Sequence, residues 1–195
     1  GLGIENRGLE TSMYNVLMCA DEIQTGLGRT GKMFACDHES VKPDLLVLGK
    51  ALSGGLYPIS ALTGEEEVMS LFTPGTHGST FGGNPLACAI GLAALDVIRG
   101  ENLAGKSAKV GAFLLARLKT LHHPALKEAR GRGLLLALEF TSRVRPLVED
   151  LMRRGLLAKD THENTIRLAP PLVISEPQAE AAFRLIRDAV VAFKG

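Results

Sequence analysis

The chain has 195 residues, 46% of them hydrophobic, and its 22 basic and 21 acidic side chains leave a formal net charge of +1. This balance excludes an obvious electrostatic surface for nucleic acid or for an anionic membrane. No apolar run approaches the length of a membrane span and no signal-peptide pattern opens the chain, so we expect a cytoplasmic protein. The three cysteines, Cys19, Cys36 and Cys88, form no Cys-x-x-Cys pair and are expected to be small buried residues or free thiols.

The first part of the chain predicts a mostly parallel α/β sheet. Residues 1–11 resemble an irregular, glycine-rich lead-in. The continuous apolar run at residues 16–20 is typical of a fully buried parallel strand. It ends at Asp21 and Glu22, which places two carboxylates at the carboxyl edge of the sheet, where ligands bind in open α/β folds.

Two further strands and a helix are expected next. The second strand covers residues 45–48 and leads directly to Lys50. The third covers residues 59–62, and the capping-box pattern at residues 63–66 predicts a helix that ends near Phe72.

A longer helix is predicted after Asn84-Pro85, an N-cap followed by proline at the first helical position. Its expected buried stripe consists of Leu86, Ile90, Ala93 and Val97.

The remainder of the chain predicts a smaller α+β domain, so we divide the chain into residues 1–104 and 105–195. The expected elements are a helix at about 101–121, a strand at 134–140, a helix at 146–154, a strand at 165–169, and a final helix from the capping box at 175–178.

Lys50 occupies an unusual position for a surface lysine. It follows a predicted buried strand and precedes a turn that contains Gly54, Gly55 and Pro58. An amine at such a strand end is expected to lose hydration and to become available as a nucleophile or base. The alternative is an ordinary lysine whose charged end reaches into water.

The segment at residues 74–83 contains four glycines with serine and threonine between them. Such a loop can bring amide donors and the hydroxyls of Ser79 and Thr80 close to an anion, although a flexible surface loop has the same composition. Together with Lys50, Asp21 and Gln24, this loop provides what pyridoxal 5′-phosphate requires: an amine for its aldehyde, a carboxylate for its ring nitrogen, and donors for its phosphate. The five histidines show no metal-ligand spacing, and we expect no metal site.

Three blocks carry a family resemblance: residues 21–26 (DEIQTG), 49–55 (GKALSGG) and 77–85 (HGSTFGGNP). In this order they resemble the hallmark segments of class III aminotransferases, which use pyridoxal 5′-phosphate. The resemblance extends from about Tyr14 to the C-terminus. The segment at residues 56–61 is more similar to the ornithine branch of the family than to the acetylornithine branch.

The resemblance implies a role for each matched position. Lys50 is implied to bond the cofactor and to act as the general acid and base, with Asp21 on the ring nitrogen. Ile23 is implied to pack under the ring, and Gln24 to bind its phenolic oxygen. Thr80, with Ser79 beside it, is implied to reach the phosphate of a neighbouring subunit's cofactor, and Arg167 to bind a substrate carboxylate.

The implied fold is that of fold-type I transferases: part of the large cofactor-binding domain followed by a small C-terminal domain. The implied reaction moves the terminal amino group of ornithine to 2-oxoglutarate, giving glutamate 5-semialdehyde and glutamate. Acetylornithine and 4-aminobutyrate stay open as amino donors.

The resemblance also implies that the chain begins where the second half of the family begins. The expected partners are therefore amino-acid and 2-oxo-acid substrates, a second copy of the chain in a homodimer, and a separate chain that carries the N-terminal half. The alternative hypothesis is a catalytically inactive C-terminal remnant that acts as a folded or dimerising module.

Overall fold

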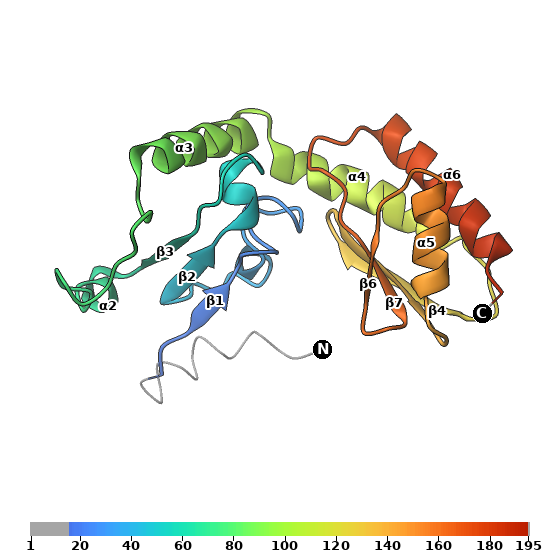
Figure 1. Ribbon diagram of the computed structural model, residues 1–195, viewed down its shortest axis with the longest axis horizontal. Coiled ribbons are helices and arrows are strands. Elements are labelled where there is room, and N and C mark those ends of the chain that lie inside the picture. Colours follow the sequence, from blue (N-terminus) through green and yellow to red (C-terminus); the bar gives the residue numbers. More distant parts are fainter. Residues whose placement is uncertain (1–15, 195) are drawn as a thin grey trace. The chain divides into compact units, whose positions relative to one another are not determined.

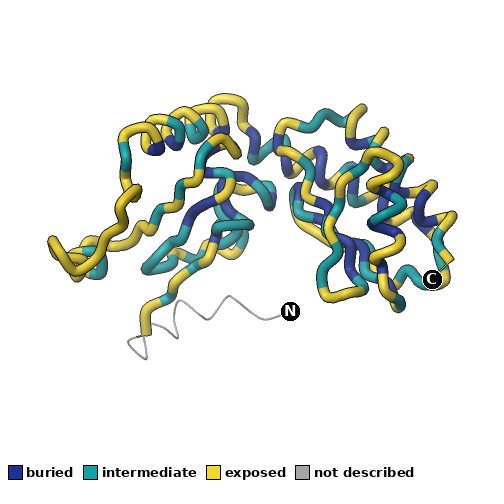
Figure 2. The backbone as a smooth tube through the Cα atoms, viewed as in Figure 1, coloured by how far each residue is buried: buried dark blue, intermediate teal, exposed yellow. Residues whose placement is uncertain are grey.

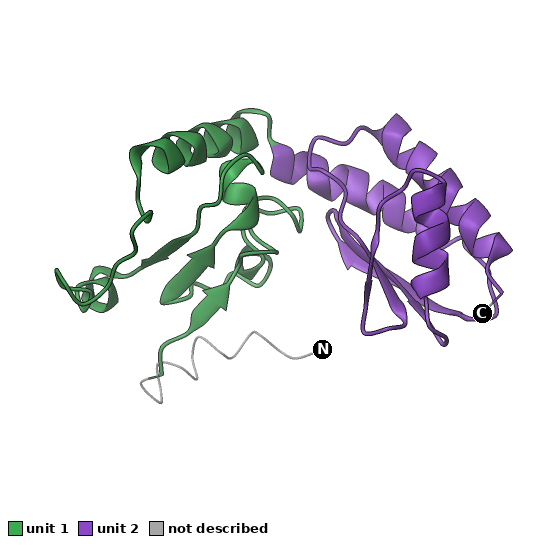
Figure 3. Cartoon of the chain, in the orientation of Figure 1, with its two compact units in different colours: residues 1–102 green, residues 103–195 purple. Residues whose placement is uncertain are grey.

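The computed structural model describes residues 16–194, and it divides into two compact units, residues 1–102 and 103–195 (Figures 1 and 3). The predicted lead-in at residues 1–11 lies outside the described residues, as does Tyr14. Within the described part of the chain, no helix is long and apolar enough to cross a membrane.

The first unit is built on a three-stranded sheet in the order β1-β2-β3. Its elements are β1 (Cys19–Asp21), η2 (Cys36–His38), β2 (Leu45–Leu48), η3 (Lys50–Ser53), β3 (Ala61–Gly64), α2 (Glu66–Met69) and α3 (Pro85–Gly100). Strands β1 and β2 are parallel, whereas β3 runs antiparallel to β2. The predicted second strand is confirmed at residues 45–48.

The first predicted strand is shorter and less buried than its composition suggested. It begins at Cys19, and both Val16 and Leu17 are 57% exposed. Among the described strands, β1 pairs only with β2. It is therefore an edge strand, with a neighbouring strand on one side only.

The capping box predicted at residues 63–66 is wrong. Thr63 and Gly64 belong to β3, which pairs with β2 up to Gly64, and the N-cap of α2 is Glu65, which makes no side-chain capping bond. Strand pairing outweighed the local helix-start pattern, and α2 ends at Met69 rather than near Phe72.

Helix α3 begins as predicted, with the side chain of Asn84 accepting a hydrogen bond from the amide of Ala87 at 2.9 Å. Its predicted buried stripe is wrong: Leu86 is 58% and Val97 47% exposed, while the buried residues are Ala87, Gly91 and Ile98. The buried face is thus displaced by one residue. Gly91 lies where α3 packs against η3, and much of the outer face of α3 is exposed (Figure 2).

The second unit is an antiparallel sheet in the order β4-β5-β7-β6, with three helices. Its elements are α4 (Leu103–Leu118), β4 (Leu126–Arg132), β5 (Leu135–Phe140), α5 (Arg145–Arg153), β6 (Lys159–Thr161), β7 (Thr165–Leu168) and α6 (Glu176–Ala192). Strands β4 and β6 were not predicted. The capping box that opens α6 is confirmed: Ser175 and Gln178 bond each other's backbone amides.

The core of the second unit lies between the helices and one face of its sheet (Figure 2). Strand β5 alternates strictly, with Leu136, Leu138 and Phe140 at most 1% exposed and the residues between them half-buried. The other members include Leu114, Leu118, Leu147, Leu151, Ile166, Phe183 and Ile186. This alternation leaves the opposite face of the sheet for polar side chains.

Candidate active site

The parallel pairing of β1 with β2 brings two predicted site residues to one sheet edge. In this register Asp21 is opposite Val47, three residues before Lys50. The backbone amide of Glu22 extends the pairing by donating to the carbonyl of Val47 at 3.0 Å. Asp21 and the segment that begins at Lys50 therefore lie next to each other at the carboxyl edge of the sheet.

Asp21 is exposed, and its own chain orients its carboxylate. Its Oδ1 accepts a hydrogen bond from the backbone amide of Ile23 at 3.0 Å, which closes a short turn at the end of β1. Among the described residues, the second oxygen, Oδ2, accepts no hydrogen bond and is available to a ligand.

Ile23 lies against the residue that precedes the lysine. A Cβ added to Gly49 would be 3.4 Å from Cγ2 of Ile23. Because Gly49 has no side chain, the side chain of Ile23 can pack directly beside the segment that carries Lys50. Gln24 follows in the same turn and is half-buried.

Lys50 has a backbone conformation that is rare for a residue with a side chain, with φ +45° at the start of η3. Left-handed values of φ cost a non-glycine residue roughly 1–2 kcal/mol, and such strain is concentrated at functional sites. The expected loss of hydration is wrong for this chain, because Lys50 is exposed. Its carrier η3 is nevertheless held firmly, with Leu52 and Ser53 buried.

Helix α3 supports the segment that carries Lys50. Gly91 of α3 packs against this segment: an added Cβ would lie 3.3 Å from Cδ1 of Ile59 and 3.6 Å from the carbonyl oxygen of Leu52. One turn further along α3, Ala94 is near the left-handed Gly54 that ends η3, with 3.8 Å between the Ala94 Cβ and a Cβ added at Gly54.

Glu22, next to the site residue Asp21, is a buried carboxylate to which the sequence analysis assigned no role. Its side chain is 3% exposed, and its carboxylate accepts hydrogen bonds from the hydroxyl of Thr25 and, at 2.9 Å, from the backbone amide of Cys36. Burial, followed by the charge of Glu22, raises the pKa of the Cys36 thiol. An acidic residue directly after a strand was the only signal in the sequence, and it does not distinguish a buried carboxylate from an exposed one.

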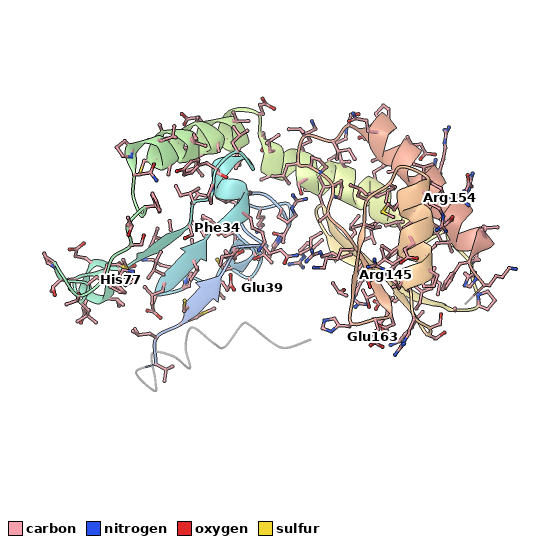
Figure 4. The ribbon with its side chains drawn as sticks, in the orientation of Figure 1. Phe34, Glu39, His77, Arg145, Arg154 and Glu163 are labelled. Atoms are coloured by element: carbon pink, nitrogen blue, oxygen red, sulfur yellow. The ribbon has the colours of Figure 1, made fainter. Side chains whose placement is uncertain are left out.

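The loop that carries Ser79 and Thr80 is exposed and held by local bonds. Ser79 Oγ accepts from the amide of Gly82 at 2.8 Å. The ring of His77, labelled in Figure 4, packs edge-on against Phe72 with 5.3 Å between ring centroids. Within residues 16–194, no hydrogen bond or ion pair joins this loop to Asp21 or Lys50.

Arg167 belongs to the second unit, on the polar face of its sheet. It is half-buried, and the register places it between Ala137 of β5 and Lys159 of β6. Arg130 of β4 is opposite Ala137 in turn. Directly opposed residues of antiparallel strands project to the same face, so three cations form a row across it.

The row is only partly neutralised. Arg130 pairs with Glu128 at 2.9 Å and with Glu139 at 2.5 Å. Within residues 16–194, neither Arg167 nor Lys159 has an ion-pair partner, which leaves a positive surface suited to a carboxylate.

The donor set at the carboxyl edge fits pyridoxal 5′-phosphate. An exposed amine, an exposed and oriented carboxylate, and an aliphatic side chain lie on the ends of two paired strands. Two grooves of roughly 600–650 Å³ occur elsewhere, one between α5 and the end of α6 and one beside η2. Neither groove is lined by a predicted site residue. We therefore locate the candidate site by the side chains at the carboxyl edge of the sheet and not by groove volume.

Comparisons with known proteins identify the family. Residues 10–190 match the family model described as aminotransferase class-III. An ornithine aminotransferase of Brevibacillus brevis is 54% identical over 174 residues, which are 89% of this chain and 44% of that protein. The ornithine aminotransferase 2 of Staphylococcus saprophyticus is 54% identical over 175 residues, 90% of this chain and 44% of that protein.

Solved structures agree. The ornithine aminotransferase of Toxoplasma gondii superimposes with a TM-score of 0.91 at 45% identity, covering 93% of this chain and 45% of that one. An acetylornithine aminotransferase from Elizabethkingia anophelis gives a TM-score of 0.89 at 46% identity, over 94% and 47%.

The chain spans about half the length of the curated relatives it matches. The fold class expected from the sequence, that of fold-type I pyridoxal-phosphate-dependent transferases, is confirmed by these structures. The chain belongs to the class III aminotransferase family.

Proposed function

We propose that this chain supplies the cofactor-bonding lysine of an aminotransferase that moves the terminal amino group of ornithine to 2-oxoglutarate. The observation that carries the proposal is the placement of Asp21, Ile23 and the strained Lys50 on the adjoining ends of β1 and β2. The names of the relatives support ornithine as the amino donor.

Each residue has a defined task in this proposal. When bound, pyridoxal 5′-phosphate supplies an aldehyde that accepts the amino group and a ring that withdraws electrons from the reacting carbon. Lys50 would hold the cofactor covalently through Nζ and would serve as the general acid and base that moves the proton at the substrate carbon. The Asp21 carboxylate holds a proton on the ring nitrogen, Ile23 packs under the ring, and Gln24 donates to the phenolic oxygen.

The remaining contacts concern the phosphate and the substrate. Ser79 and Thr80 donate to the phosphate of a neighbouring subunit's cofactor, which makes a homodimer part of the proposal. Arg167 binds a substrate carboxylate through its two parallel N–H donors, and the positive row in which it lies favours that charge. In this assignment residues 1–104 are part of the cofactor domain and residues 105–195 form the small domain.

Borohydride trapping tests the proposal. The chain is incubated with pyridoxal 5′-phosphate, alone and with the N-terminal half of the Brevibacillus brevis relative as a separate chain. Borohydride then makes any bond between lysine and cofactor permanent, and peptide mass spectrometry locates it. We expect the label on Lys50, its loss in Lys50→Ala, and its retention in Lys42→Ala, a control at an exposed lysine. Equal labelling of wild type and Lys50→Ala, or no label in either mixture, overturns the proposal in favour of a non-catalytic module.

A second candidate donor is acetylornithine. The Elizabethkingia anophelis enzyme, named for that substrate, is as similar to this chain as the ornithine enzymes of known structure are, at 46% against 45% identity. Steady-state rates of the assembled halves with ornithine, acetylornithine and 4-aminobutyrate distinguish the donors. We expect the highest kcat/KM with ornithine.

A further inference from the structure

Glu22 makes contacts with four partners although it lies beside the proposed site and not in it. Its backbone amide donates to the carbonyl of Val47 at 3.0 Å, and its carbonyl accepts from the amide of Gly26 at 2.9 Å. One carboxylate oxygen accepts from the Thr25 hydroxyl and the other from the Cys36 amide at 2.9 Å. The residue therefore bonds to β2, to the turn that follows it, and to the start of η2.

The bond to Cys36 closes a long loop. It spans 14 residues, whereas the bond from Gly31 to Gly28 spans three and the bond between Thr30 and His38 spans eight. A carboxylate at 3% exposure is costly to bury and is tolerated only when hydrogen bonds satisfy it. Both carboxylate oxygens of Glu22 accept hydrogen bonds, one from Thr25 and one from Cys36, and these two bonds compensate for its burial.

The turn next to Glu22 is packed without spare room. A Cβ added at Gly26 would be 2.8 Å from the carbonyl oxygen of Glu22 and 3.1 Å from its Cβ. Residues 23–25 are therefore confined between the Gly26 contact and the carboxylate that binds Thr25. Ile23, whose amide orients the Asp21 carboxylate, lies inside this confined turn.

We infer that Glu22 is a positioning residue, which aims the Asp21 carboxylate at the ring nitrogen of the cofactor by anchoring the turn at residues 23–25 to Cys36. The inference rests on the proposed function, and it assigns to Glu22 no contact with cofactor or substrate. It acts through the bond from the Ile23 amide to Asp21.

Two readouts test this role, on wild type, Glu22→Gln, Glu22→Ala and the control Glu101→Gln, which changes an exposed glutamate. The first is hydrogen exchange at the amides of Ile23 and Cys36, measured by NMR on the chain alone. A hydrogen bond to a charged group stabilises the protected amide sufficiently that loss of the bond accelerates its exchange by about tenfold or more. We expect this acceleration in Glu22→Ala, a smaller one in Glu22→Gln, whose neutral amide oxygen can still accept from the Cys36 amide, and none in Glu101→Gln.

The second readout distinguishes a misplaced Asp21 carboxylate from a general loss of folding in the Glu22 variants. Affinity is measured for pyridoxal 5′-phosphate and for its deaza analogue, in which carbon replaces the ring nitrogen, with the N-terminal half added. Because Asp21 acts on that nitrogen only, we expect the Glu22 variants to lose about tenfold in affinity for the natural cofactor while keeping their affinity for the analogue. Glu22→Gln retains the side-chain shape and serves if Glu22→Ala fails to fold.

The outcomes are distinguishable. Unchanged exchange in both variants, or equal losses for the two ligands, overturns the positioning role. If wild type binds neither ligand, the proposed function fails, and the exchange rates alone decide whether Glu22 anchors the loop.

Discussion

Ile23 covers the open side of Gly49 across the ends of two parallel strands, with Cγ2 of Ile23 3.4 Å from the position that a Cβ on Gly49 would take. One residue further along, Lys50 begins η3. The contact therefore connects the residue proposed to lie under the cofactor ring with the backbone that carries the proposed cofactor-bonding amine.

Enlarging Gly49 is expected to disturb this contact. A single methyl group meets Ile23 at an ordinary van der Waals distance, so Gly49→Ala is expected to fold with nearly unchanged stability. The two methyl groups of Gly49→Val overfill the space and are expected to cost about 1–3 kcal/mol. Urea unfolding of the two variants checks this, and equal stability would show that Ile23 can move aside.

Strain at Lys50 predicts an unusual order of stabilities. At φ +45°, glycine is unstrained and alanine is not. After allowance for the greater freedom of glycine in the unfolded chain, Lys50→Gly is expected to be more stable than Lys50→Ala by about 1 kcal/mol. Thermal or urea unfolding measures the difference. The same pair of changes at Lys42, which has no left-handed backbone, should show no advantage for glycine.

The approach of α4 to the loop before β5 depends on Gly111. A Cβ there would be 2.0 Å from the carbonyl oxygen of Gly133 and 2.2 Å from its carbonyl carbon. Backbone atoms on both sides must move, so Gly111→Ala is expected to destabilise the second unit by about 3 kcal/mol or more.

The control for this change is Gly100→Ala. Gly100 ends α3, and nothing lies within 4 Å of an added Cβ. That variant is expected to gain about 0.5–1 kcal/mol, because alanine loses less conformational entropy than glycine on folding. A neutral result for Gly111→Ala in denaturant titrations would contradict the close approach.

Glu139 is expected to contribute stability that depends on pH. A hydrogen bond from Lys127, together with one from Arg130, lowers the pKa of the Glu139 carboxyl below its usual value. A carboxyl whose pKa is lowered by folding stabilises the native state above its unfolded pKa, and this stabilisation is lost as the pH falls through the folded pKa.

Glu139→Gln is therefore expected to lower the melting temperature near neutral pH and to flatten its decline in the acid range. Melting temperatures measured from neutral pH down through the usual glutamate range check this. Glu101→Gln, at an exposed glutamate with no ion pair in residues 16–194, serves as control. Parallel curves for wild type and Glu139→Gln would show that the cluster with Lys127 and Arg130 does not act through this charge.

Local patterns in the sequence predicted the elements that depend on local bonds. The capping box at Ser175 and the N-cap at Asn84 both form, because each needs only residues within one helical turn. The continuous run at residues 45–48 was sufficient to predict β2. Strands β4 and β6 escaped prediction because charged residues and glycine dominate them, and pairing with β5 and β7 alone makes them strands.

The sequence by itself determined the family and the types of group at the proposed site, since these follow from residue identity and order. Only the tertiary structure decided which groups are near one another. The register of β1 and β2 placed Asp21 beside the Lys50 segment, and packing against Ile59 and η3 buried Gly91 of α3. The burial of Glu22 likewise depends on an amide 14 residues away. Such contacts arise from packing and strand pairing between distant segments, which no local pattern specifies.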